Sequence, residues 1–294
     1  MCDEKTVDDN EKFLRQPGLL SRRQFNVLTA GTALAMLLPR RADARDITES
    51  DVRVQTPDGT ADCYLVHPAS GKHPGVIIWP DVLGLRPAFR LMGKRLAESG
   101  YSVLVVNPYY RSATAPVIAE GASFQDPSTR DIVMPLAKEL TAETHMTDAR
   151  AFVRFLDRHS AVDTTRKLGT MGYCMGGPIS MRTAAAVPDR IGAGASFHGG
   201  RLVTDGADSP HLLVPKMKAH YLFAIAENDD EGDPKAKQVL RESFDKAGLP
   251  AEIEVYEGAM HGWCPPDSRV YNQAQAERAW SRLLVLFEKA LAQG

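Results

Sequence analysis

The chain lacks the features that mark nucleic-acid-binding and membrane-spanning proteins. It carries 35 basic and 37 acidic residues, a net charge of −2, and no long basic run, so nothing in it favours a nucleic-acid partner. The apolar run from Val27 to Leu38 holds about 12 residues, too few to span a bilayer stably. Repeats and low-complexity linkers are also missing. With 44% hydrophobic and 24% charged residues, the composition predicts an ordinary globular protein.

The N-terminal segment has the layout of an export signal. Ser21–Phe25 is a twin-arginine motif, the apolar run follows it, and Ala42-Asp43-Ala44 is a small-residue cleavage site. We therefore predict a twin-arginine signal over residues 1–44 and a mature domain over 45–294. This predicts export by the Tat machinery to the periplasm or the medium. An ordinary amphipathic N-terminal helix is the alternative.

Cysteine is scarce in the predicted mature chain. Cys63, Cys174 and Cys264 remain after cleavage. An odd number in an oxidising compartment implies at least one free thiol. A disulfide between Cys63 and Cys264 stays open, because nothing in the sequence fixes it.

Apolar, β-branched runs alternate with helical patterns along the mature chain. The expected strands are Asp51–Gln55, Ala61–His67, Gly75–Trp79, Ser102–Asn107, Lys167–Gly172, Gly194–His198, His220–Ala226 and Glu252–Tyr256. The expected helices are Arg86–Glu98, Glu143–His159, Pro178–Ala186, Pro234–Lys246 and Asn272–Ala290.

This alternation predicts an α/β fold with about eight strands, mostly parallel, and helices on both faces of the sheet. The first two strands flank the turn signal at Pro57–Gly59 and form an expected antiparallel hairpin. Ser112 to Thr141 is the least regular stretch, and we expect it to cover the site as a loop or cap.

Three chemically capable residues follow expected strands. Cys174 comes after the fifth strand, Asp229 after the seventh and His261 after the eighth. Catalytic residues of such sheets lie at the carboxyl ends of strands, and nucleophile, acid, histidine is the order of α/β-hydrolases. Cys174 is then the nucleophile, His261 the base and Asp229 the residue that orients it.

The surroundings of Cys174 resemble a nucleophile elbow. Gly172, Gly176 and Gly177 leave room for a strained strand-to-helix turn. The helix that Pro178 opens offers a positive dipole end, which favours a thiolate. The backbone N–H of Met175 is the expected first oxyanion donor, and a loop after the third strand supplies the second.

Other interpretations of these residues, without a catalytic role or with a different residue in it, stay open. Cys174 fits a small buried residue in a glycine-rich turn, and Asp230 is an alternative to Asp229 in the acidic "ENDDEGD" loop. A metal site formed by His261, Cys264 and Cys174 lacks a fourth ligand at a suitable spacing. His198, in "FHGG", is a further candidate for lining the pocket.

The residues now quoted resemble the dienelactone hydrolase family of α/β-hydrolases over nearly all of 50–292. The resemblance rests on Gly172–Gly177, the Asp229 loop and the "HGW" at His261, with weaker matches in "PDVLGL" and "NPYYR". It implies a cysteine hydrolase that opens an enol-lactone and needs no cofactor and no metal.

The resemblance also implies three further site residues. An acidic residue that contacts the resting thiol matches Asp81, although the family usually has glutamate there. The backbone N–H of Val82 matches the second oxyanion donor, and Arg111 matches an arginine that meets the substrate carboxylate. The family's second arginine, a few residues after the histidine, has no match before Arg269.

Together these observations predict an exported, monomeric cysteine hydrolase acting on a small lactone or carboxylic ester. Two rivals share the same residues. One is a general esterase or small peptidase, since one scaffold hosts many reactions. The other is a non-catalytic binding or thiol-redox protein in which Cys174 forms a disulfide or adduct.

Overall fold

The structure is a computed structural model that describes residues 4–15 and 44–292. The twin-arginine motif, the apolar run after it and most of the predicted cleavage site lie outside the described residues. Within these two ranges, no helix combines the length and the apolar character needed to cross a membrane.

Eight strands form one sheet in the order β1-β2-β4-β3-β5-β6-β7-β8. Their bounds are β1 Ile47–Thr56, β2 Gly59–Pro68, β3 Gly75–Trp79, β4 Ser102–Val106, β5 Leu168–Tyr173, β6 Ile191–Phe197, β7 His220–Ala226 and β8 Ala251–Tyr256. The first two strands pair as an antiparallel hairpin, and β2 also pairs antiparallel with β4. All pairs from β4 to β8 are parallel. This is the α/β-hydrolase fold that the sequence predicted.

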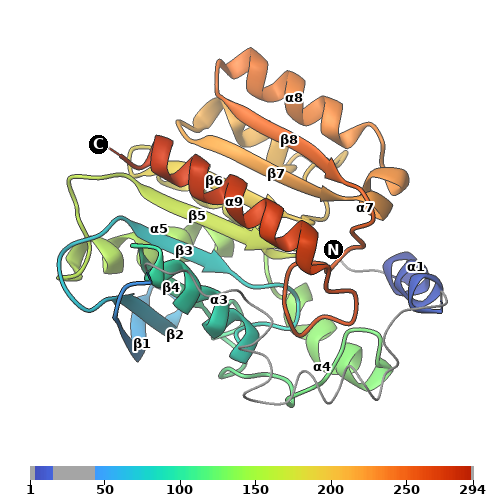
Figure 1. Cartoon of the computed structure of the whole chain (residues 1–294), viewed down its shortest axis with the longest axis horizontal. Coiled ribbons are helices and arrows are strands. Elements are labelled where there is room, and N and C mark those ends of the chain that lie inside the picture. The colour runs from blue at the N-terminus through green and yellow to red at the C-terminus, as the bar shows by residue number, and fades with distance from the viewer. Residues whose placement is uncertain (1–3, 16–43, 293–294) are drawn as a thin grey trace.

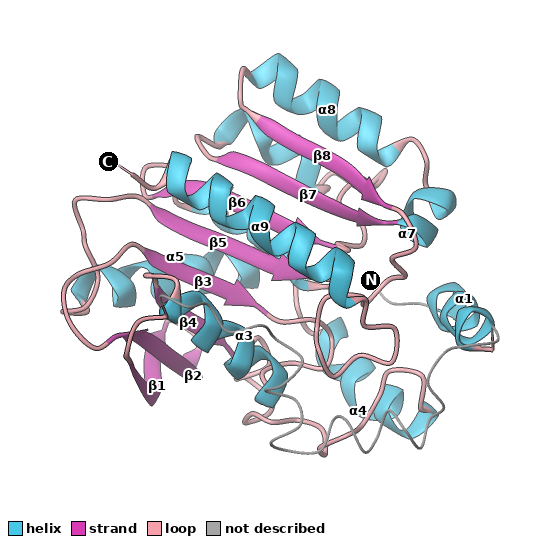
Figure 2. Cartoon of the chain, viewed as in Figure 1, coloured by secondary structure: helices cyan, strands magenta, loops and turns pink. Residues whose placement is uncertain are grey.

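The helices cover both faces of the sheet (Figures 1 and 2). Their bounds are α1 Glu4–Leu14, α3 Pro87–Glu98, α4 Pro127–Lys138, α5 Ala142–Arg158, α6 Gly176–Ala186, α7 Glu227–Gly232, α8 Ala236–Ala247 and α9 Gln273–Ala290, with a 3-10 helix η2 at Pro210–Lys216. In Figure 1, α3 and α9 lie in front of the sheet and α5 behind it.

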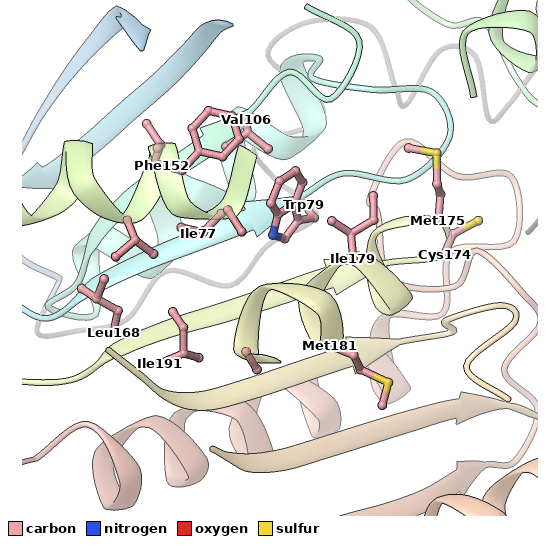
Figure 3. Close-up of a cluster of buried hydrophobic side chains, with 14 of the residues drawn as sticks. Ile77, Trp79, Val106, Phe152, Leu168, Cys174, Met175, Ile179, Met181 and Ile191 are labelled. Atoms are coloured by element: carbon pink, nitrogen blue, oxygen red, sulfur yellow. The ribbon is translucent and has the colours of Figure 1, made fainter. Parts of the chain in front are cut away.

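Successive side chains of a central strand point to opposite faces of the sheet and pack into two separate hydrophobic cores. On β3, Ile77 and Trp79 belong to the core that also holds Phe152 of α5. Val76 and Ile78 face the opposite core, with residues of α3 and α9. Because both faces are covered, these strands are apolar throughout, as expected of a parallel sheet. Figure 3 shows the first core, with Cys174 at its edge.

The expectation of an irregular stretch from Ser112 to Thr141 is wrong in part, since it contains α4. The helix begins at Pro127, directly after Asp126, and buries Val133 and Ala137. Its apolar periodicity is weak, and Pro135 inside the helix breaks the usual signal. The acidic "ENDDEG" segment is likewise a short helix, α7, and not a loop.

Candidate active site

The candidate residues meet at the carboxyl edge of the parallel strands. Cys174 directly follows β5, Asp229 lies in α7 directly after β7, and His261 lies in the loop after β8. Asp81 follows β3 at the same edge. Chain segments that are far apart in sequence are thus brought together because parallel neighbours end side by side.

Cys174 sits on a strained turn that only glycine neighbours allow. Its φ of +51° is in the left-handed region, which is unusual for a residue with a side chain. A Cβ added to Gly172 would lie 1.9 Å from the carbonyl oxygen of Gly176, and one on Gly176 would lie 2.2 Å from that of Trp79. The predicted role of the glycines is confirmed, although α6 starts at Gly176, two residues before Pro178.

His261 is fixed from several sides. Its Nδ1 lies 2.8 Å from each carboxylate oxygen of Asp229. Its backbone N–H donates to Oδ1 of Asn228 at 2.8 Å, and its carbonyl oxygen accepts from Nδ2 of Asn10 at 3.0 Å. The ring is therefore held with Nδ1 toward the acid, which leaves Nε2 for the other side.

The neighbouring Asp230, the open alternative, is placed elsewhere. Its carboxylate pairs with Nζ of Lys237 at 2.6 Å. The carboxylate that contacts His261 belongs to Asp229.

The charge state of His261 is set by its two partners. Burial disfavours the imidazolium, but the Asp229 carboxylate and the negative charge of a Cys174 thiolate outweigh it and raise the pKa of His261 to about 10. A hydrogen bond between His261 and Cys174 acts in the same direction. At neutral pH His261 is therefore expected in its imidazolium form.

A second histidine packs against the first. The His198 ring lies edge-on to His261 with 5.1 Å between centroids, and it lines the cavity that holds Cys174. Burial, with the nearby positive charge of His261, lowers the pKa of His198 to about 3, so its imidazole is neutral. It is the pocket-lining residue suggested by "FHGG".

The two expected oxyanion donors flank the nucleophile. Val82 lines the same cavity as Cys174, and Met175 is the residue that follows the nucleophile at the start of α6. In the part of the chain that the structure describes, no backbone acceptor takes a hydrogen bond from either N–H. An oxyanion donor needs an N–H that is not already used in this way.

Asp81 lies at the cavity, but its carboxylate is engaged by an arginine. Nη1 and Nη2 of Arg86 donate to Oδ1 and Oδ2 of Asp81 at 2.7 and 3.0 Å. The same guanidinium donates to Asp267 at 2.6 and 2.9 Å. Burial raises the pKa of Asp81, and Arg86 partly offsets this effect.

Arg86 is the site residue that sequence reasoning missed. It is only 5% exposed although it carries a charge, and two carboxylates neutralise it. One faint signal was present, an arginine directly before Pro87 at an expected helix start. The pairing with Asp267, 181 residues away, is visible only in the fold.

Arg111 is not brought to the site. Its guanidinium pairs with Asp148 at 2.7 and 2.8 Å and also with Asp58, and the residue does not line the Cys174 cavity. The expectation that it meets a substrate carboxylate is not supported by this arrangement. Arg269 does line the cavity, but it pairs with Asp126 at 2.8 Å.

The other two cysteines of the described ranges are buried free thiols. Cys63 and Cys264 are 2% and 6% exposed and belong to different cores, so no disulfide joins them. Across residues 4–15 and 44–292, no group of three His, Cys, Asp or Glu side chains is placed to hold a metal ion. The metal alternative for Cys174, His261 and Cys264 gains no support.

Comparison with known proteins identifies the family of the chain. Residues 61–291 match the dienelactone hydrolase family. A Methylorubrum extorquens protein provisionally named carboxymethylenebutenolidase is 26% identical over 94% of this chain and 95% of its own length. The carboxymethylenebutenolidase of Rhodococcus opacus is also 26% identical, over 80% of this chain and 90% of its own.

Solved structures agree on the fold. A Klebsiella pneumoniae protein, provisionally named a dienelactone hydrolase, superposes with a TM-score of 0.72 at 21% identity and covers 83% of this chain and 99% of its own. The chain belongs to the dienelactone hydrolase family and is a hydrolase.

Proposed function

We propose that the protein is a cysteine hydrolase that cleaves a small, uncharged lactone or carboxylic ester through an acyl-enzyme. The observation that carries the proposal is the meeting of Cys174, on its strained elbow, with a His261 ring whose Nδ1 is bound by Asp229. In this proposal Cys174 is the nucleophile, His261 the proton carrier and Asp229 its orienter.

The first half-reaction starts from the thiolate. The Cys174 sulfur attacks the carbonyl carbon, an S–C bond forms, and the oxygen takes the negative charge beside the N–H groups of Met175 and Val82. The tetrahedral intermediate then collapses, the C–O bond breaks, and His261 gives its proton to the leaving oxygen. In a lactone this oxygen stays attached to the acyl group.

The second half-reaction returns the enzyme to its starting state. His261, now neutral, takes a proton from a water that attacks the thioester, and the S–C bond breaks. The acid leaves as a carboxylate once its remaining proton has passed to solvent, and the thiolate–imidazolium pair is restored. Thiol, imidazole, backbone donors and water suffice for each step, so the proposal needs no cofactor.

The charges at the cavity support an uncharged substrate. Both arginines that line it, Arg86 and Arg269, are already paired with carboxylates. Asp81 and Asp267 line it as well. A substrate carboxylate would have to compete with these partners for the guanidinium groups. A dienelactone, which carries a carboxylate, is therefore expected to be a weaker substrate than a neutral ester.

Export through the twin-arginine signal is part of the proposal, on the sequence of residues 21–44 alone. Fractionation of cells that express the chain tests it. We expect the mature protein outside the cytoplasm with Arg45 at its N-terminus, and a lysine pair in place of Arg22 and Arg23 should retain the precursor inside.

The function is tested with p-nitrophenyl acetate and a dienelactone, comparing the wild-type chain with Cys174→Ala. We expect turnover of the neutral ester that disappears in the variant, and slower turnover of the dienelactone. Ester hydrolysis that persists in Cys174→Ala would refute the mechanism. Faster turnover of the dienelactone would refute the argument on charge.

A further inference from the structure

The cavity around Cys174 is small and closed on one side by the N-terminal helix. Its volume is about 50 Å³, room for about three to five waters at roughly 10–15 Å³ each. Ligand sites usually hold about 300–1,000 Å³. Thr6 and Asn10 of α1 are part of its lining. The substrate therefore has little space while α1 is in place.

A wider groove adjoins this cavity. It has a volume of about 280 Å³, and Asp229 and His261 line it together with Lys5, Thr6 and Asp9 of α1. Thr6 and His261 line both spaces. Helix α1 thus lies across the boundary between the cavity of the nucleophile and the more open groove. Figure 1 shows α1 at the end of the sheet where α7 lies.

The contacts of α1 are specific. Asn10 is 3% exposed, and its Nδ2 donates to the carbonyl oxygen of His261 at 3.0 Å in a buried hydrogen bond. Val7 packs against the first core, the one that holds Trp79 and Phe152, and Nζ of Lys5 lies against Gly232 of α7. Thr6 and Asn10 are four residues apart, so they share one face of the helix.

The helix depends on this docking. It has 11 residues, and isolated helices shorter than about 12–15 residues are marginal in water. Once it leaves the groove, the segment should lose its helical structure. The covered and the open state would then differ in the conformation of this segment. All strands of the sheet lie between Ile47 and Tyr256, outside this segment.

We propose that the mouth of the active site is a docking surface for the chain's own residues 4–14, and that α1 is a removable cover which keeps Cys174 closed in the precursor. The segment precedes the twin-arginine motif, so cleavage after Ala44 would remove it together with the signal. The inference rests on the proposed function, because it concerns access to the nucleophile of that same site.

The test is alkylation of the full chain by iodoacetamide, with labelled cysteines located by peptide mass spectrometry. In Asn10→Asp the donor to the His261 carbonyl oxygen is replaced by a second acceptor at a buried position. We expect the alkylation rate of Cys174 to rise at least about 10-fold, which corresponds to about 1.4 kcal/mol. The matched control is Asp8→Asn, the reverse change at an exposed position of α1, with a rate within about twofold of wild type.

Two buried thiols report on the integrity of the fold. Cys63 and Cys264 should stay unlabelled in every variant. If Asn10→Asp labels them too, Asn10→Ser, which shortens the side chain without adding charge, takes its place. An unchanged alkylation rate of Cys174 in the folded Asn10 variant would overturn the inference.

Ester hydrolysis separates the two proposals. With p-nitrophenyl butyrate, we expect kcat/KM to rise in Asn10→Asp as alkylation does. If no variant hydrolyses the ester while alkylation of Cys174 still accelerates, the cover stands and the hydrolase mechanism fails.

Discussion

Replacing Asp229 by asparagine should lower the pKa of His261 and so disfavour its imidazolium form. Asp229 and Cys174 together raise the pKa of His261 from 6.5 to about 10, against the effect of burial. At about 1.36 kcal/mol per unit, this rise corresponds to about 5 kcal/mol in favour of the imidazolium. Asp229 is the largest of the causes that raise this pKa, so its removal should cost at least about 2–3 kcal/mol. The equilibrium between the thiolate–imidazolium pair and the neutral pair then shifts about 100-fold toward the neutral pair.

The assay is ¹⁵N NMR of histidine-labelled protein between pH 6 and 11, with kcat/KM for a neutral lactone measured in parallel. In Asp229→Asn we expect the titration of His261 to move from about 10 to near 8, with a matching loss of activity on the alkaline side. Asp230→Asn is the control, since Asp230 pairs with Lys237 and not with His261. A His261 that titrates within about half a unit of wild type in Asp229→Asn would refute the reasoning.

Three further changes test other parts of the structure. Gly176→Ala places a Cβ 2.2 Å from the Trp79 carbonyl oxygen, so we expect the free energy of unfolding, measured with urea, to fall by at least about 3 kcal/mol. The control is Gly121→Ala, where the added Cβ meets open space at φ +77° and the loss should be about 1 kcal/mol. Burial, with nearby Arg182, lowers the pKa of His145 to about 3. Between pH 6.5 and pH 3, this histidine therefore binds a proton in the unfolded chain but not in the folded chain. The free energy of unfolding should therefore fall by about 1.4 kcal/mol for each pH unit between pH 6.5 and pH 3. In His145→Gln, we expect a smaller difference between the free energies of unfolding measured at pH 7.5 and pH 5.5. An equal difference in wild type and variant would contradict the assignment. Arg111→Met should change KM for a neutral ester less than about twofold, and a tenfold rise would return that arginine to the site.

The strands were the most predictable part of the fold. Gly75–Trp79 and His220–Ala226 have the bounds expected from their continuous apolar runs. Such runs are informative because a strand covered on both faces must be apolar throughout. Helix α4 was missed because Pro135 interrupts its pattern, and α1 because its segment has the layout of an export signal.

The site could be predicted as far as it follows from local chemistry. The glycines around Cys174 predict the strained turn, since no other residue leaves room beside the carbonyl oxygens of Trp79 and Gly176. The choice between Asp229 and Asp230 could not be made from sequence. Adjacent residues differ by about 100° in direction on a helix, and only the fold shows which carboxylate meets His261.

The sequence by itself determined the individual strands and the glycine-rich turn at Cys174, because each depends on residues close together in the chain. Only the tertiary structure decided the charges around the site. Arg86 meets Asp267 across 181 residues, and Arg111 is held by Asp148 away from the cavity. It also brought Asn10 to His261. Ion pairs and hydrogen bonds act over a few ångströms, so their partners are set by how distant segments pack and not by sequence spacing.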